Sequence, residues 1–149
     1  MGGYDLSKLD VLVADDNDFM LRILDTMLKA VGITNVRRCT NSEQAYAALV
    51  RKPADIVIVD WNMAPVPGIE LVRKLRDART SPCPDAPIIM LTGHSDRDRV
   101  IEAREAGISS YLRKPVSVQV LYKRIVEMIE NPRPALREEP ADDDIWAIG

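Results

Sequence analysis

ADIVIVD, residues 54–60, is the stretch that decides the fold. Ile56 to Val59 form an unbroken β-branched run that is too short for a helix and apolar on both faces. Such a run is typical of a central strand in a parallel sheet that helices cover on both sides. The run ends in the carboxylate of Asp60, and turn-forming residues follow it. Because ligands bind outside the carboxyl ends of strands in open parallel sheets, we expect Asp60 to lie at a functional site.

Four other segments have the composition of strands, and helical patterns alternate with them. Strand and helix alternate five times along the chain, which is typical of an α/β protein with a doubly wound parallel sheet. We predict a five-stranded sheet in the order 2-1-3-4-5, the middle layer of a three-layer sandwich. The predicted strands are 10–14, 35–39, 56–60, 87–91 and 109–112, and the predicted helices begin at or just after Asp18, Thr40, Gly68, Ser95 and Ser117.

Local signals predict where individual helices begin and end. Thr40 is followed three residues later by a glutamate, which has the form of a capping box. Gly107 is a predicted C-terminal stop for the helix that precedes it. The residues expected on the inner side of that helix are Val100, Ile101 and Ala103.

Composition and charge exclude several classes of protein. A net charge of −3 gives no support for nucleic-acid binding, which usually needs a basic surface. No apolar run approaches the roughly 20 residues of a membrane span, and nothing resembles a signal peptide. We therefore expect a cytoplasmic protein with no membrane or nucleic-acid partner, in which Cys39 and Cys83 stay reduced. The single histidine, His94, excludes a site that needs two imidazoles.

Polar side chains gather where the predicted strands end. Asp15 and Asp16 follow the first strand, Asp60 ends the third, Thr92 follows the fourth, and Lys114 follows the fifth. Three carboxylates in one crevice repel each other, so they need a cation or protons to coexist. Ligation by oxygen alone, beside a group that can hold phosphate, favours Mg²⁺. A carboxylate beside Mg²⁺ can act as a nucleophile and form an aspartyl phosphate.

This set of residues resembles the receiver domain of two-component response regulators, close to the stand-alone chemotaxis type. The resemblance covers residues 8–131 and implies a flavodoxin-like fold. It divides the chain into an N-terminal extension (1–7), a receiver domain (8–131) and a C-terminal tail (132–149). The matching residues are Asp15, Asp16, Asp60, Trp61, Asn62, Met63, Gly68, Thr92, Gly93, Tyr111, Lys114 and Pro115.

The resemblance implies a role for the acidic residues and the lysine. Asp60 is the phosphoacceptor. Asp15 and Asp16 form the acidic pair that binds Mg²⁺ together with Asp60, and the backbone carbonyl of Asn62 is a further ligand. Lys114 lies opposite the metal and contacts the phosphoryl oxygens.

The resemblance also implies a switch. The hydroxyl of Thr92 moves onto the phosphoryl group, and the ring of Tyr111 rotates into the space that it leaves. Gly93 leaves room for the phosphodonor or for water. The peptide bond between Lys114 and Pro115 is implied to be cis.

Two positions depart from the family pattern. The proline that the family carries four residues after the phosphoacceptor is Ala64 here, and Pro65 stands one place later, so the geometry of this loop is left open. His94, two residues after Thr92, is expected to overhang the site rather than to accept phosphate.

The resemblance implies a single-domain response regulator whose phosphodonor is a sensor histidine kinase or a histidine phosphotransfer protein. It would catalyse only its own phosphorylation and dephosphorylation. The residues after 131 are too few for a typical output domain, so we expect output by contact with a downstream protein. Three alternatives are a degenerate receiver that serves as a docking or dimerisation module, an Asp-nucleophile phosphatase and a flavin protein. The phosphatase pattern needs a second aspartate where Asn62 stands, and the flavin pattern needs a phosphate-binding nest where Asp15 and Asp16 stand.

The tail, residues 132–149, combines prolines and a run of acids with a final apolar cluster of Ile145, Trp146, Ala147 and Ile148. Its first part has the composition of a solvated linker. The tail is either mobile, folded back on the domain, docked into a neighbouring molecule in a homodimer, or read as a motif by a partner.

Overall fold

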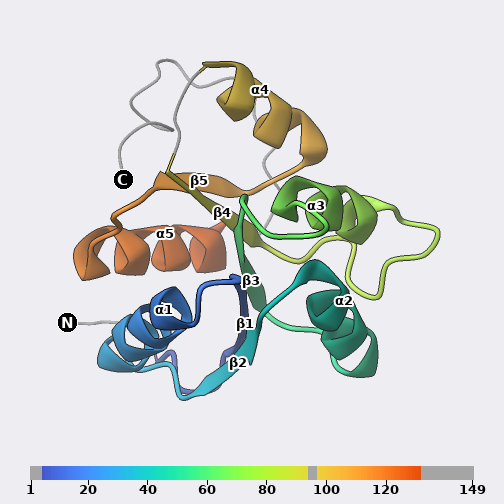
Figure 1. The fold of residues 1–149 in the computed structure, drawn as a ribbon. Helices are drawn as coiled ribbons and strands as arrows, with labels where there is room; N and C mark the ends of the chain where they lie inside the picture. The colour runs from blue at the N-terminus through green and yellow to red at the C-terminus, as the bar shows by residue number, and fades with distance from the viewer. Residues whose placement is uncertain (1–4, 94–96, 132–149) are drawn as a thin grey trace.

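The computed structural model describes residues 5–93 and 97–131, and within them five parallel strands form one sheet (Figure 1). The order β2-β1-β3-β4-β5 confirms the predicted topology. β4 and β5 begin and end one residue later than predicted. The strands are β1 (Asp10–Ala14), β2 (Asn35–Cys39), β3 (Ile56–Asp60), β4 (Ile88–Thr92) and β5 (Ser110–Arg113).

Helices cover both faces of the sheet and complete the three layers (Figure 1). Alternate strand residues point to opposite faces, so each strand contributes to two apolar clusters. One cluster lies under α1 and α5, and the other lies under α2, α3 and α4. The helices are α1 (Asp18–Ala30), α2 (Ser42–Arg51), α3 (Gly68–Arg76), α4 (Arg97–Ala106) and α5 (Val118–Glu130).

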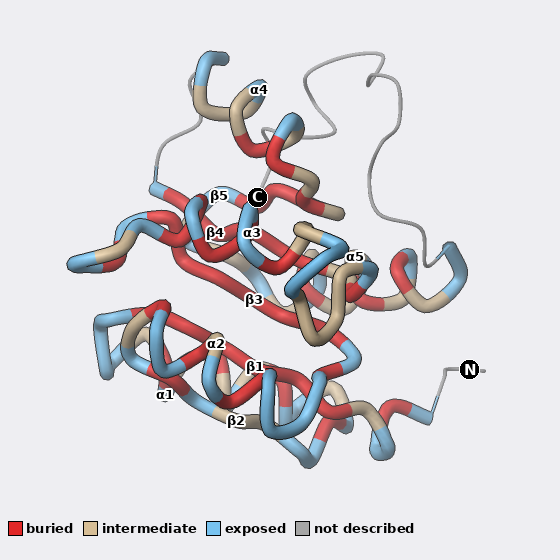
Figure 2. Tube along the Cα trace, turned by 90° about the vertical axis from the view of Figure 1, so that its right-hand side faces the viewer, coloured by how far each residue is buried: buried red, intermediate tan, exposed pale blue. Residues whose placement is uncertain are grey.

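The three central strands are buried along their whole length. Every residue of β1, β3 and β4 is buried, and Figure 2 shows β3 as a continuous buried segment through the molecule. β2 lies at an edge of the sheet and is partly exposed, as its two arginines indicate. Within the described residues, no helix has the length and apolar character needed to span a membrane.

The start of α2 differs from the prediction. Asn41, and not Thr40, is the N-cap: its side chain accepts a hydrogen bond from the backbone N–H of Gln44 at 2.7 Å. The side chain of Gln44 in turn accepts from the backbone N–H of Thr40 at 2.6 Å. The capping box predicted at Thr40 is therefore wrong by one residue. Asparagine is as good an N-cap as threonine, and glutamine can fill the third helical position as glutamate does.

The inner face of α4 also differs from the prediction. Ala103 is buried and Val100 packs against the core, but Ile101 is 38% exposed. Successive helical residues are separated by about 100°, so Ile101 falls off the face that Val100 and Ala103 share. The helix ends at Ala106, and Gly107 follows it with a φ of +104° that is accessible to glycine, which confirms the predicted stop. The cap predicted at Ser95 lies outside the described residues.

Candidate functional site

Three carboxylates meet at the carboxyl edge of the sheet. Asp15 and Asp16 follow β1, and Asp60 is the last residue of the neighbouring strand β3. One oxygen of each carboxylate lies within 4.8 Å of the other two. Asp15 and Asp60 are buried, at 1% and 3% exposure, whereas Asp16 is exposed. The structure thus brings together the acidic residues that the sequence placed at the strand ends.

A lysine that directly follows β5, the strand at one edge of the sheet, reaches this cluster. The Nζ atom of Lys114 lies 3.1 Å from Asp60 Oδ1 and 3.4 Å from Asp15 Oδ2. The backbone N–H of Lys114 donates to the carbonyl oxygen of Thr92 at 2.8 Å, which joins the ends of β5 and β4. Lys114 therefore holds one positive charge between two buried negative charges.

The electrostatics of Asp60 are dominated by burial. Burial, and then the negative charge of Asp15, raise the pKa of Asp60 to about 6, although Lys114 and a hydrogen bond from the backbone of Asn62 act in the opposite direction. One lysine does not offset the combined effect of desolvation and carboxylate repulsion. At neutral pH the carboxylate is mainly ionised, and burial and the charge of Asp15 disfavour this ionised form.

The donor atoms fit a divalent cation. Asp60 Oδ1 is buried and accepts no hydrogen bond from the described residues, although it forms the ion pair with Lys114. Carboxylate oxygens are the ligands that Mg²⁺ prefers, and a cation here would reduce the repulsion between Asp15 and Asp60. Asn62 lies two residues after Asp60 and is exposed, and the role of its carbonyl stays a prediction.

Thr92 and Tyr111 lie on the neighbouring strands β4 and β5. Asp60 pairs with Leu91, so Thr92 lies one residue beyond Asp60 on the neighbouring strand. Tyr111 pairs with Met90, which shares a sheet face with Thr92. Both Thr92 and Tyr111 are 0% exposed, and the Tyr111 ring already packs inside the apolar cluster. Their roles as a switch stay a prediction.

The remaining predicted positions surround this site. Gly93 follows Thr92 and is exposed, and His94 lies outside the described residues. The bond between Lys114 and Pro115 is cis, as the resemblance implied. A second cis bond among the described residues joins Ala64 to Pro65, in the loop where this chain departs from the family pattern.

The sequence offered no signal for two further contacts around the Asp60 loop. The guanidinium group of Arg99 lies over the ring of Trp61, 5.2 Å from its centroid. The hydroxyl of Ser42 donates to the carbonyl oxygen of Val66 at 2.9 Å and attaches the loop to α2. Both contacts join elements far apart in the chain, so no local pattern predicts them.

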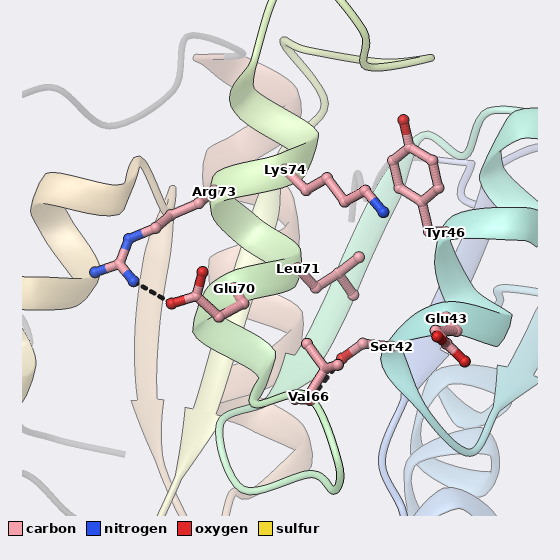
Figure 3. Close-up of a pocket in the computed structure, with 8 residues that line it drawn as sticks. All are labelled: Ser42, Glu43, Tyr46, Val66, Glu70, Leu71, Arg73 and Lys74. Atoms are coloured by element: carbon pink, nitrogen blue, oxygen red, sulfur yellow. Dashed lines mark hydrogen bonds and ion pairs between the residues drawn. The ribbon is translucent and has the colours of Figure 1, made fainter.

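A separate groove of about 410 Å³ lies between α2 and α3 (Figure 3). Lys74 points its ammonium group at the ring of Tyr46, 4.2 Å from the centroid. Arg73, at the rim, pairs with Glu70 and, across to α4, with Glu102. The groove does not contain the acidic cluster, and its basic side chains are engaged by neighbours.

Comparison of the chain with known proteins agrees with this geometry. The model of the response regulator receiver domain family matches residues 11–126. The chain belongs to that family. Chemotaxis protein CheY of Pseudomonas aeruginosa is 34% identical over 123 residues, which cover 82% of this chain and 97% of the relative.

Solved receiver structures have the same fold. A response regulator receiver domain protein from Clostridium thermocellum superimposes with a TM-score of 0.74 at 29% identity, over 83% of this chain and 96% of that chain. The receiver domain of a Francisella response regulator gives a TM-score of 0.75 at 25% identity, over 85% and 100% of the two chains. Receiver domains act in two-component signalling, and a phosphorylated aspartate and Mg²⁺ binding are features of their family.

Proposed function

We propose that this receiver accepts a phosphoryl group on Asp60 from the phosphohistidine of a sensor histidine kinase or a histidine phosphotransfer protein. The observation that carries the proposal is the buried Asp60 carboxylate, which has the carboxylate of Asp15 and the ammonium of Lys114 as its neighbours. This placement combines a nucleophile, a site for a cation and a fixed positive charge. Those are the groups that phosphoryl transfer to a carboxylate requires.

In the proposed reaction an oxygen of Asp60 attacks phosphorus. The new O–P bond forms as the P–N bond of the donor breaks, and the electron pair of that bond returns to the imidazole. Asp15, Asp16 and Asp60, with the carbonyl of Asn62, would hold Mg²⁺, which when bound would offset charge on the transferring phosphoryl group. Lys114, whose Nζ pairs with Asp60 at 3.1 Å, would donate to a phosphoryl oxygen.

The proposed output is contact with a downstream protein. The Thr92 hydroxyl is proposed to move onto the phosphoryl group, and Tyr111 and the adjoining helices would then change the surface that a target reads. We assign this unit to residues 8–131, with 1–7 as an extension and 132–149 as a tail available for partner or homodimer contacts. The reactions proposed for the chain itself are its own phosphorylation and dephosphorylation.

Trp61 supplies the direct test, because it follows Asp60 and is 7% exposed. The full chain carrying Trp146→Phe leaves Trp61 as the one tryptophan. Its fluorescence is expected to change on adding Mg²⁺ and to change again on adding acetyl phosphate, a small phosphodonor. Intact-mass measurement should show the addition of one phosphoryl group.

Asp60→Asn is the matched control, since it keeps the shape of the side chain and removes the nucleophile. This variant should show no phosphoryl addition. If the parent protein is not modified either, or if Asp60→Asn is modified to the same extent, the proposed reaction is wrong. If the parent protein is not modified, a receiver that serves only as a docking module is the better account.

A further inference from the structure

α4 is held to the domain by little apolar surface. Its buried residues are Ala103 and Ala106, with Val100 partly buried, whereas Ile101 faces solvent. The other helices of the described chain each bury at least one leucine. Because apolar burial is the main stabilising contribution of a packed helix, α4 is the one that can be displaced with the smallest loss.

Polar contacts supply what the apolar face of α4 lacks. In the middle of the helix, Glu102 accepts a hydrogen bond from Arg73 of α3 at 2.9 Å. In the first turn, the Arg99 guanidinium lies over the Trp61 ring, 5.2 Å from the centroid and within the roughly 6 Å range of cation–π attraction. Arg99 is half-buried and Trp61 is buried, so solvent screens this contact only in part.

Trp61 is fixed to the strand ends that form the acidic site. Its backbone N–H donates to the carbonyl of Leu91 at 2.9 Å, and its own carbonyl accepts from Gly68 at 2.9 Å. It stands between Asp60 and Asn62 in the chain. A rearrangement of the backbone around Asp60 must therefore move or reorient the ring on which Arg99 rests.

We infer that Arg99 is a positioning residue that couples the state of Asp60 to α4 through the ring of Trp61. The inference deepens the proposed function and rests on it, because it names a contact, separate from Thr92 and Tyr111, by which phosphorylation reaches the helix. A cation–π contact is suited to this role: it is strong enough to bias the position of a weakly packed helix and weak enough to be exchanged for another arrangement. Arg99 need not touch the phosphoryl group.

The first measurement uses the full chain without Mg²⁺ or phosphodonor. Arg99→Gln keeps a polar side chain and removes the cation, and Arg97→Gln removes an exposed charge from the same helix as a control. Amide hydrogen exchange in α4 is expected to accelerate about threefold to tenfold in Arg99→Gln and to stay unchanged in Arg97→Gln. Arg99→Lys, which keeps the cation, should restore most of the protection. Equal exchange in the two glutamine variants would overturn the proposed role of this contact in stabilising α4.

The second measurement follows the change in amide hydrogen exchange when Mg²⁺ and a phosphoryl mimic are added. With Mg²⁺ and beryllium fluoride, a phosphoryl mimic, the parent protein should show altered exchange in both the Asp60 loop and α4. Arg99→Gln should keep the response of the Asp60 loop and lose that of α4, whereas Arg99→Lys and Arg97→Gln should keep both. If Arg99 only stabilised the helix, Arg99→Gln would lower the protection of α4 by the same factor with and without Mg²⁺ and beryllium fluoride. The response of α4 to these additions would then stay intact. An intact α4 response in Arg99→Gln would overturn the coupling.

The two proposals fail in different ways. If neither the Asp60 loop of the parent nor its mass responds to Mg²⁺ with beryllium fluoride or acetyl phosphate, the proposed function fails and the coupling fails with it. If the Asp60 loop responds in every variant and α4 responds equally in all of them, the proposed function stands and the role of Arg99 alone is overturned.

Discussion

Gly68 approaches Asp60 so closely that a Cβ atom added to Gly68 would lie 2.1 Å from the Asp60 carbonyl oxygen. The same Cβ would lie 2.7 Å from a methyl group of Val59. Because the nearest atom belongs to the backbone of β3, no side-chain rotation relieves the overlap. The first residue of α3 is therefore restricted to glycine by packing, although its φ is ordinary.

Gly68→Ala is expected to lower the free energy of unfolding by about 1–3 kcal/mol, the usual effect of overpacking. Urea denaturation measures it. Gly93→Ala is the control, because no described atom lies within 4 Å of a Cβ built there. Identical denaturation midpoints for the two variants would contradict the close approach.

The raised pKa of Asp60 predicts that the metal-free protein loses stability as pH rises. The folded-state pKa is about 6 against an ordinary value of 3.8, so the proton binds more tightly to the folded state. The stability associated with this proton is fully present below about pH 4 and is lost as pH rises through about 6, a total of about 3 kcal/mol. Asp60→Asn should therefore be the more stable protein at about pH 8, and this advantage should disappear by about pH 4.

Thermal unfolding across this pH range tests the sign of the stability difference between the parent protein and Asp60→Asn. Adding Mg²⁺ at about pH 8 should stabilise the parent more than Asp60→Asn, because a bound cation offsets the same repulsion. Asp98→Asn, an exposed substitution on α4, serves as the control for a change of net charge. An Asp60→Asn variant that is less stable than the parent at about pH 8 without Mg²⁺ would contradict the prediction.

Lys114→Met should slow phosphorylation by acetyl phosphate by about 100-fold, the usual effect of removing one donor that stabilises a transition state. The same change removes the cation that lowers the pKa of Asp60, so less of the nucleophile is ionised at neutral pH. Intact-mass time courses measure the rate. Lys123→Met, an exposed lysine of α5, is the control and should leave the rate unchanged.

Arg76 ties the end of α3 to two loops at the amino edge of the sheet. Its guanidinium group donates to the carbonyls of Gly107, Pro84 and Ala86 at 2.7–2.8 Å, and burial lowers its pKa. Arg76→Met leaves these three acceptors without their donor and is expected to lower the free energy of unfolding by about 3 kcal/mol.

The control for Arg76 is Arg79→Met. The Arg79 side chain is 87% exposed and pairs with Asp77, so its loss should change stability by less than about 0.5 kcal/mol. Urea denaturation of both variants gives the comparison. A similar loss in the two would show that the buried hydrogen bonds of Arg76 contribute nothing beyond its charge.

The sequence predicted a helix end reliably where only one residue type suits the backbone conformation. It was less reliable where several residue types can fill the same position. Gly107 ends α4 because its positive φ favours glycine. Thr40 and Asn41 are both good N-caps, and the helix begins after the second because its side chain meets the N–H of Gln44. Ile101 belongs to an apolar cluster in the sequence, yet the packing angle of α4 turns it to solvent.

The sequence by itself determined the alternation of strand and helix and the edge of the sheet at which Asp15, Asp60, Thr92 and Lys114 gather, because parallel strands all end on one side. Tertiary structure alone decided how those groups affect one another: the position of Lys114 Nζ between two carboxylates and the burial that raises the pKa of Asp60. It also decided the contact of Arg99 with Trp61, since their side chains come from separate elements and meet only after the helices pack. Strand ends follow from topology, whereas distances between side chains follow from packing, which no single segment encodes.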